Sequence, residues 1–335
     1  MVIIAGLRAA GPILTPLALA AFVAAVSLPA LNWLRGRGTP TVLAILAIVF
    51  VDVVILASFG WIVAQTVLEF RAALPDYIAR GNALEAAARA RLAAWGFPVA
   101  PEFWGEFLQP ERLFDALTAA ARNAGSFLAV FFLVILYLVF ILAESVNLPG
   151  KLQAVFGSAA QRGVGLSGIV GVGAVLIQVE RYLVLKTLIS LGTGLLIGIG
   201  AGVLGVDFAL FWGFLAFALN FVPNIGSLIA AIPAVLVALL QLGPGPALAL
   251  AIVYGVVNVI FGNVLEPIVI GRHLRISPII TLVSLVFWGW TWGIVGMFLA
   301  VPLTITMRIV MENTRTLSRF AALLGTGVQA PGRQS

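Results

Sequence analysis

Long apolar segments, separated by short polar or basic turns, dominate the pattern of this chain. A helix of ~20 apolar residues crosses the ~30 Å hydrocarbon core of a bilayer. We expect each apolar segment to be a membrane-spanning helix or one arm of a helical hairpin. The segments are residues 13–34, 41–68, 127–146, 183–206, 208–221, 225–242, 247–265, 278–290 and 292–308. The pattern predicts an all-α, polytopic integral membrane protein with about eight transmembrane helices, including broken or re-entrant hairpins.

Changes in composition along the chain predict four regions. Residues 1–68 hold the N-terminal transmembrane helices, and residues 69–124 form an amphipathic segment. Residues 125–310 form a transmembrane transport core, and residues 311–335 form a polar tail. Lys and Arg concentrate in the short cytoplasmic loops of membrane proteins. The basic loops of this chain fall on one side if every segment crosses or returns, so we expect the amphipathic segment to be extracytoplasmic and the tail to be cytoplasmic.

The apolar run from residue 208 to residue 307 breaks repeatedly at Pro, Asn and Gly. Two breaks are FVPNIG (221–226) and LEPIVIGRHLRISP (265–278), and a gentler one is WGWTWGIVG (288–296). Lipid cannot hydrogen-bond the freed backbone groups, so such a break must be buried in protein or line a wet cavity. Paired interruptions of this kind mark the substrate site of many transporters. The pattern therefore indicates a membrane transporter.

Two of the apolar segments are short. Residues 278–290 reach only ~20 Å as a helix, and residues 208–221 are nearly as short. We interpret both as arms of hairpins that turn within the membrane; the alternative is a tilted short helix in a locally thinned bilayer. Trp288, Trp290 and Trp292 are expected to anchor the second short pair at the membrane interface.

Composition supports the membrane assignment. The 335 residues are 62% hydrophobic and 10% charged, with a mean hydropathy of +1.14, whereas a soluble domain carries about 25% charged residues. The chain has no cysteine and one histidine, His273, which leaves little for a metal site or a catalytic triad. The net charge of +6 comes from scattered Lys and Arg, which suits an anionic lipid surface rather than a nucleic acid.

No cofactor or enzymatic activity is predicted. Gly163, Gly165 and Gly168 spell G-x-G-x-x-G, but a dinucleotide site needs a strand–helix–strand unit, which the flanking sequence does not indicate. The sequence contains no Walker A motif, so we expect no ATP hydrolysis, and it contains neither H-E-x-x-H nor G-x-S-x-G.

The first break supplies candidate pathway residues. Asn220 precedes it, and Pro223, Asn224 and Gly226 form it. Pro removes a backbone donor and Gly permits a close backbone approach. The freed carbonyl groups and the Asn224 amide suit a cation or a polyol. The alternative is a plain turn at the membrane surface.

The second break supplies the remaining polar candidates. They are Asn258, Asn263, Glu266, Pro267 and Gly271. Asn263 and Glu266 are three residues apart, so they share a face of an α-helix. The carboxylate of Glu266 would pair with Arg272 or Arg275 as a gate, or bind a proton or an ion. The alternative is a solvated loop acid beside basic residues.

Asp52 lies near the middle of a predicted span. A charge at the bilayer centre costs ~3 kcal/mol on insertion scales, so such residues usually face the protein interior and often act in transport. Two structural alternatives remain: a protonated Asp hydrogen-bonded to a neighbouring helix, or a polar group facing a lumen.

On another span, Gly194, Gly198 and Gly202 are four residues apart and predict a face for close helix packing.

Three ordered motifs suggest a family. They are FVPNIGSLIAAIPAVLVALLQLG, NVLEPIVIGRHLRISPIITLVSLVFWGW and GIVGMFLAVPLT. In their order and spacing the chain resembles the autoinducer-2 exporter family, predicted permeases of bacteria and archaea. The match covers residues 181–308 and, more weakly, residues 12–147. Members usually begin with a full first helix, whereas residues 1–10 provide half of one, so the helix is short here or the true start lies upstream.

The resemblance implies a fold and a function. It implies about eight transmembrane helices, an exposed segment between the third and the fourth, and a homo-oligomer of transport-competent protomers in the cytoplasmic (inner) membrane of a bacterium or archaeon. Signalling molecules such as autoinducer-2 are proposed substrates of some members, and sodium or lithium exchange for protons is proposed for others. We therefore expect a secondary transporter that exports a small polar solute or exchanges monovalent cations for protons (H+ or Na+). The alternatives are a channel for ions or solutes and a membrane scaffold without transport.

Overall fold

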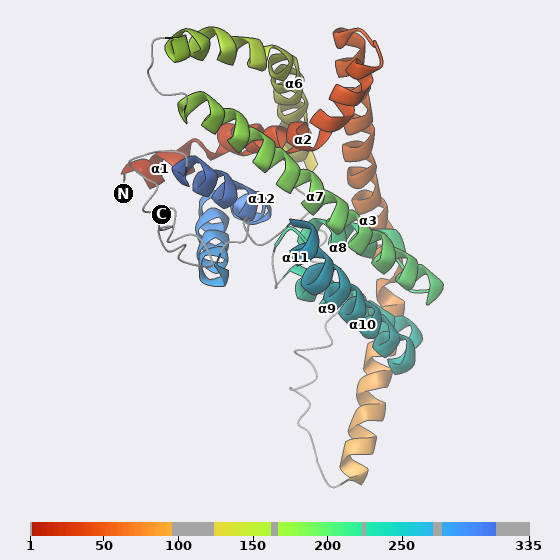
Figure 1. Cartoon of the computed structure of the whole chain (residues 1–335). Helices are drawn as coiled ribbons and strands as arrows, with labels where there is room; N and C mark the ends of the chain where they lie inside the picture. The colour runs from red at the N-terminus through yellow and green to blue at the C-terminus, as the bar shows by residue number, and fades with distance from the viewer. Residues whose placement is uncertain (1, 96–123, 162–166, 223–225, 271–276, 313–335) are drawn as a thin grey trace.

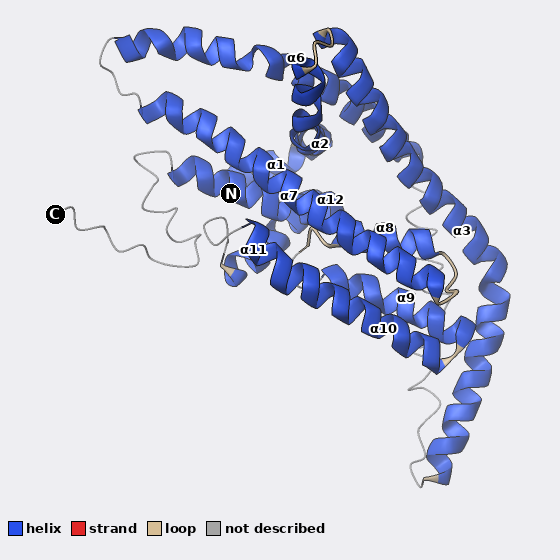
Figure 2. Ribbon diagram, turned by 45° about the vertical axis from the view of Figure 1, so that its right-hand side comes forward, coloured by secondary structure: helices blue, strands red, loops and turns tan. Residues whose placement is uncertain are grey.

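The computed structural model describes residues 2–95, 124–161, 167–222, 226–270 and 277–312, and the described residues contain helices and no strand (Figure 1, Figure 2). The helices are α1 (Val2–Ala9), α2 (Gly11–Gly36), α3 (Thr41–Ala94), α6 (Ala124–Gln161), α7 (Ser167–Val203), α8 (Ala209–Leu219), α9 (Gly226–Leu242), α10 (Pro244–Asn258), the π-helix η1 (Val259–Leu265), α11 (Glu266–Ile270) and α12 (Pro278–Glu312). Within this part of the chain, 5 helices are long and apolar enough to cross a membrane, and shorter apolar helices accompany them. The predicted all-α membrane fold is confirmed.

Helix α3 is longer than the apolar pattern suggested. It runs for 54 residues through Pro75 and across the predicted boundary at residue 68. Its last turns extend past the other helices as an arm (Figure 1). Residues 147–179 are also largely helical, because α6 continues to Gln161 and α7 begins at Ser167.

The helices pack into two groups that share α3. The first, called here the N-terminal group, is α2, the first half of α3 and α6, and its core includes Ala20, Ala24 and Leu138. The second, the C-terminal group, is α7 to α10 with the second half of α3, and its core includes Trp212 and Leu250. Smaller clusters join α12 to α2 and α7. The two groups also meet directly, because α2 packs against α7, and α12 packs against both α2 and α7.

The glycine face of α7 packs against α8, as predicted. A Cβ atom on Gly194 would lie 2.6 Å from the carbonyl oxygen of Gly213 on α8, and one on Gly198 would lie 3.4 Å from the Cα of Gly213. Absent side chains let the two backbones approach closely. Helix α8 has 11 residues, about 16 Å, so it does not cross the bilayer.

Residues 208–242, called here the first hairpin, comprise α8, its turn and α9. Asp207, just before α8, donates its backbone N–H to Gln241 Oε1 at 2.8 Å, and Gln241 Nε2 donates to Asp207 Oδ1 at 2.9 Å. Both arms therefore end side by side, and the turn between them lies at the opposite end. A Cβ atom on Gly226 would collide with the carbonyl oxygen of Leu219, so the start of α9 requires glycine.

Residues 278–308, called here the second hairpin, fold back within α12. Gly293 has φ +67 and ψ −146, and it separates two helical halves, drawn in lighter and darker blue in Figure 1. Trp288 Nε1 donates to Thr304 Oγ1 at 3.4 Å across the hairpin. The predicted interfacial role of the tryptophans is wrong for Trp288, which is 7% exposed, and Trp292 Nε1 donates to the carbonyl oxygen of Leu7 at 3.1 Å. Trp288 and Trp292 therefore contact protein, whereas Trp290 is 56% exposed and stays a candidate for the interface.

Candidate functional site

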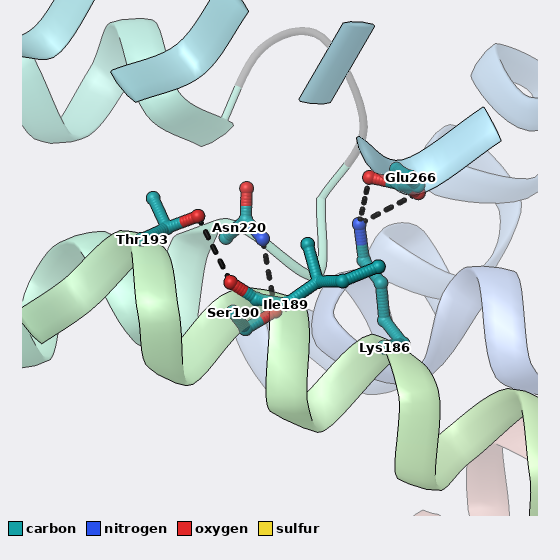
Figure 3. A network of polar contacts seen from close by, with 6 residues as sticks. All are labelled: Lys186, Ile189, Ser190, Thr193, Asn220 and Glu266. Atoms are coloured by element: carbon teal, nitrogen blue, oxygen red, sulfur yellow. Dashed lines mark hydrogen bonds and ion pairs between the residues drawn. The ribbon is translucent and has the colours of Figure 1, made fainter. Parts of the chain in front are cut away.

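A buried ion pair joins the second predicted break to α7. Lys186 on α7 is 2% exposed, and its Nζ lies 2.8 Å and 2.9 Å from the two carboxylate oxygens of Glu266 (Figure 3). The Glu266 side chain is 28% exposed. Charges inside a membrane protein are costly and almost always pair with one another. The two side chains therefore compensate each other within an apolar bundle.

Irregular backbone places Glu266 against α7. The π-helix η1 ends at Leu265, immediately before Glu266, and Pro267 follows. Short π-helical segments occur frequently at functional sites, and Pro cannot donate a backbone hydrogen bond. Sequence reasoning missed Lys186 as the partner, although a Lys inside a predicted span was the available signal. The partners expected for Glu266, Arg272 and Arg275, lie outside the described residues.

Polar residues form a row on the same face of α7. Lys186, Ser190 and Thr193 are buried and spaced by four and three residues. Asn220, which follows α8 in the first hairpin, donates from Nδ2 to Ser190 Oγ at 2.9 Å (Figure 3). The row therefore brings together Asn220 from the first break and Glu266 from the second. We call Lys186, Ser190 and Thr193 the polar row.

The other predicted residues of the two breaks lie in different places. Pro223, Asn224 and Gly271 are outside the described residues, as is His273; Gly226 is buried, and Asn258 and Pro267 are partly buried. Asn263 is exposed, whereas Glu266 meets Lys186. The alignment expected for an α-helix therefore does not bring Asn263 to the ion pair, because the wider turns of the π-helix alter the spacing.

Asp52 occupies a separate site in the N-terminal group. It is 8% exposed, and the Ser27 hydroxyl on α2 lies 3.0 Å from each of its carboxyl oxygens. Both residues belong to continuous α-helices, and Pro29 follows Ser27 by two residues in α2. The structure thus gives Asp52 a hydrogen-bond partner on a neighbouring helix, which was one of the predicted alternatives.

A cavity of about 970 Å³ lies between α2, α6, α7 and α12. Its walls are mainly apolar, and Phe22, Leu183 and Leu299 are among them. Polar side chains also line it: Asn32, Arg35, Glu144, Ser145, Glu180 and Thr306. A mostly apolar cavity with a few polar groups and a volume near 1,000 Å³ is typical of small-molecule sites. Sequence reasoning missed the cavity because four helices build it.

These features define a class of protein. A polytopic helical membrane protein that combines broken helices, an ion pair with a buried lysine and a cavity between helices has the features of a membrane transporter. The chain belongs to the AI-2E transporter family, whose model, described as AI-2E family transporter, matches residues 1–316. The resemblance inferred from the three motifs is confirmed.

Relatives cover nearly the whole chain. The AI-2 transport protein TqsA of Escherichia coli (strain K12) is 34% identical over 324 residues, which are 97% of this chain and 92% of TqsA. YhhT of the same strain is 34% identical over 327 residues, 98% of this chain and 92% of YhhT. A Haemophilus influenzae protein is 31% identical over 336 residues, 97% of this chain and 93% of that protein.

Proposed function

We propose that this chain is a secondary transporter that exports a small polar solute, of the autoinducer-2 kind, across the bacterial cytoplasmic membrane. The observation that carries the proposal is the Lys186–Glu266 ion pair beside a broken helix, since irregular backbone and paired charges at membrane depth mark substrate and ion pathways. The relative TqsA, named as an AI-2 transport protein, supports the choice of solute. The proposal assigns no catalytic chemistry and no nucleic-acid partner to the chain.

The cavity and the polar row provide a path for the solute. Arg35 and Asn32 line one part of the cavity near the end of α2, and Phe22 and Leu183 line a deeper part. Lys186 lies one turn further along α7 than Leu183. The solute would enter beside the polar side chains and pass to the polar row when the C-terminal group moves against α2 and α6. Alternating access in secondary transporters is largely such a rigid-body movement of one helical bundle against another.

Exchange of monovalent cations for protons is a second candidate, and Glu266 favours it. A proton or Na+ that bound the Glu266 carboxylate would compete with the ammonium group of Lys186. Binding of the ion would therefore free Lys186 from its partner and change the charge of the polar row. This competition would couple the position of the broken helix to an ion gradient.

We further propose a membrane orientation and an assembly. The α3 arm, with Tyr77 and the ends of the first hairpin, would face outside, and Arg35 would face the cytoplasm. Trp95 at the end of the arm is 74% exposed, so a second copy of the chain is the expected cover in a homo-oligomer. An impermeant thiol reagent would test the orientation: a Cys at position 36 must react only from the cytoplasmic side.

Flux measurements test the proposed function. The purified protein would be reconstituted into liposomes loaded with autoinducer-2, and efflux would be followed with and without an imposed proton or sodium gradient. Saturable, gradient-dependent efflux is expected, with empty liposomes as the control. Flux that does not saturate and ignores the gradients would indicate a channel, and no flux of the solute or of monovalent cations would indicate a scaffold.

A further inference from the structure

Three phenylalanine rings from separate elements meet inside the molecule. Phe22 lies on α2, Phe221 lies at the turn of the first hairpin, and Phe298 lies just past the turn of the second. The ring centroids are 5.4 Å apart for Phe22 and Phe221, 5.3 Å for Phe22 and Phe298, and 4.6 Å for Phe221 and Phe298. All three separations fall in the range of favourable aromatic pairs.

The cluster adjoins both the cavity and the polar row. Phe22 lines the cavity, and so does Leu299, the neighbour of Phe298. Phe221 is 1% exposed and directly follows Asn220, whose side chain is bonded to Ser190 of the polar row. The three rings therefore connect the wall of the cavity to the residue that contacts Ser190.

Both hairpins contribute a ring to the cluster, and the base of the first hairpin is held by α3. A Cβ atom on Gly226 would collide with the Leu219 carbonyl oxygen, and one on Gly296 would collide with that of Trp288, so each turn is tightly packed. The base of the first hairpin is tied to α3, because the Tyr77 hydroxyl donates to Asp207 Oδ2 at 2.6 Å. A hairpin held at its base can displace its turn as a unit.

We infer that Phe22, Phe221 and Phe298 form an aromatic gate, which is closed in this structure, between the cavity and the polar row of α7. This inference rests on the proposed transport function and adds to it the barrier that the solute must pass. Opening requires the two hairpins to separate at this point, because Phe221 lies at the turn of the first and Phe298 lies in the helix after the turn of the second. Large apolar rings in contact offer a polar solute no hydrogen-bond partner, so the closed gate would oppose its passage from the cavity to the polar row.

Thiol labelling tests the gate without any substrate, since the chain has no cysteine of its own. Ser190→Cys would report on the far side of the gate, and Ser145→Cys would report on the cavity. In nanodiscs, a water-soluble methanethiosulfonate reagent should modify Ser145→Cys readily and Ser190→Cys slowly. Adding Phe298→Ala should raise the Ser190→Cys rate about tenfold and leave the Ser145→Cys rate unchanged.

A matched control is Phe59→Ala, because Phe59 stacks on Phe214 of the first hairpin, 4.3 Å between centroids, and is not one of the three gate rings. The gate is refuted if Phe59→Ala and Phe298→Ala change the labelling rate of Ser190→Cys equally. It is also refuted if, with all phenylalanines in place, Ser190→Cys reacts as fast as Ser145→Cys. Phe298→Leu replaces Phe298→Ala if the latter does not fold. If the protein transports the solute but Phe298→Ala does not change the labelling of Ser190→Cys, the gate alone is refuted. If Phe298→Ala raises that labelling but the protein transports nothing, the transport function is refuted and the aromatic barrier remains.

Discussion

Two carboxyl groups, that of the buried Asp52 and that of the partly buried Glu266, sit in different surroundings. Asp52 lies between the continuous α-helices α2 and α3 and accepts a hydrogen bond from the Ser27 hydroxyl. Glu266 lies where a π-helix meets a proline, and its partner is the ammonium group of Lys186. One site therefore has an uncharged partner on a continuous α-helix, and the other has a charged partner at a π-helical break.

We propose that this difference separates an acid that serves helix packing, Asp52, from one that serves transport, Glu266. A buried ion pair is weak evidence for stability, because the cost of desolvating two charges offsets their attraction. An ion pair at a break in the helix is therefore better explained by a role in function. A carboxyl group that bonds one hydroxyl across two regular helices is sufficiently explained by the packing of those helices.

The same substitution at both acids should produce the largest contrast. Glu266→Leu leaves the Lys186 ammonium, whose side chain is 3% exposed, without a counter-charge, which costs about 4 kcal/mol. Asp52→Leu leaves the Ser27 hydroxyl without its acceptor and costs about 1.5 kcal/mol. Thermal unfolding in detergent measures both losses. Equal losses at the two sites would end the distinction between them.

Removing the second charge should restore stability but not transport. The double variant Lys186→Met and Glu266→Leu replaces the ion pair by apolar side chains, which often leaves stability unchanged or improved, so about 3 kcal/mol of the loss should return. Flux in liposomes should stay at the background level. If flux returns together with stability, the ion pair is structural and the proposed pathway is wrong.

Glu266→Gln should affect coupling more than stability. The amide oxygen still accepts one hydrogen bond from Lys186 but carries no charge, so we expect a loss of about 2 kcal/mol and a folded protein. Flux should no longer respond to a proton or sodium gradient. The comparison is made by imposing each gradient on the variant and on the wild type, and an unchanged response would exclude Glu266 as the coupling site.

Asp52→Asn should have the smallest effect. The Asn amide keeps an oxygen acceptor for the Ser27 hydroxyl, so the expected loss is below about 1 kcal/mol and the gradient dependence of flux should persist. Loss of that dependence would place Asp52 in the ion pathway. A wild-type response in the double variant Glu266→Gln and Asp52→Asn would remove both acids from the mechanism.

The sequence alone determined the class of fold and the positions of the breaks. Local properties carried these predictions: helix length, apolar composition and the positions of Pro and Gly. They correctly predicted an all-α membrane protein, the glycine face of α7 and the turn at Gly226. They also singled out Asn220 and Glu266, because polar residues beside a break in an apolar run are conspicuous. The long course of α3 was missed, since an amphipathic helix can continue an apolar one without any local signal.

The tertiary structure alone decided which residues meet. Lys186 and Glu266 are 80 positions apart, and neither local periodicity nor spacing relates them. The cavity needs four helices, and the aromatic cluster needs three elements, so each exists only after those elements have packed. A sequence pattern relates residues that are three or four positions apart, within one helical turn. These sites instead depend on how closely helices that are distant in the sequence approach one another, which glycine faces and hairpins determine.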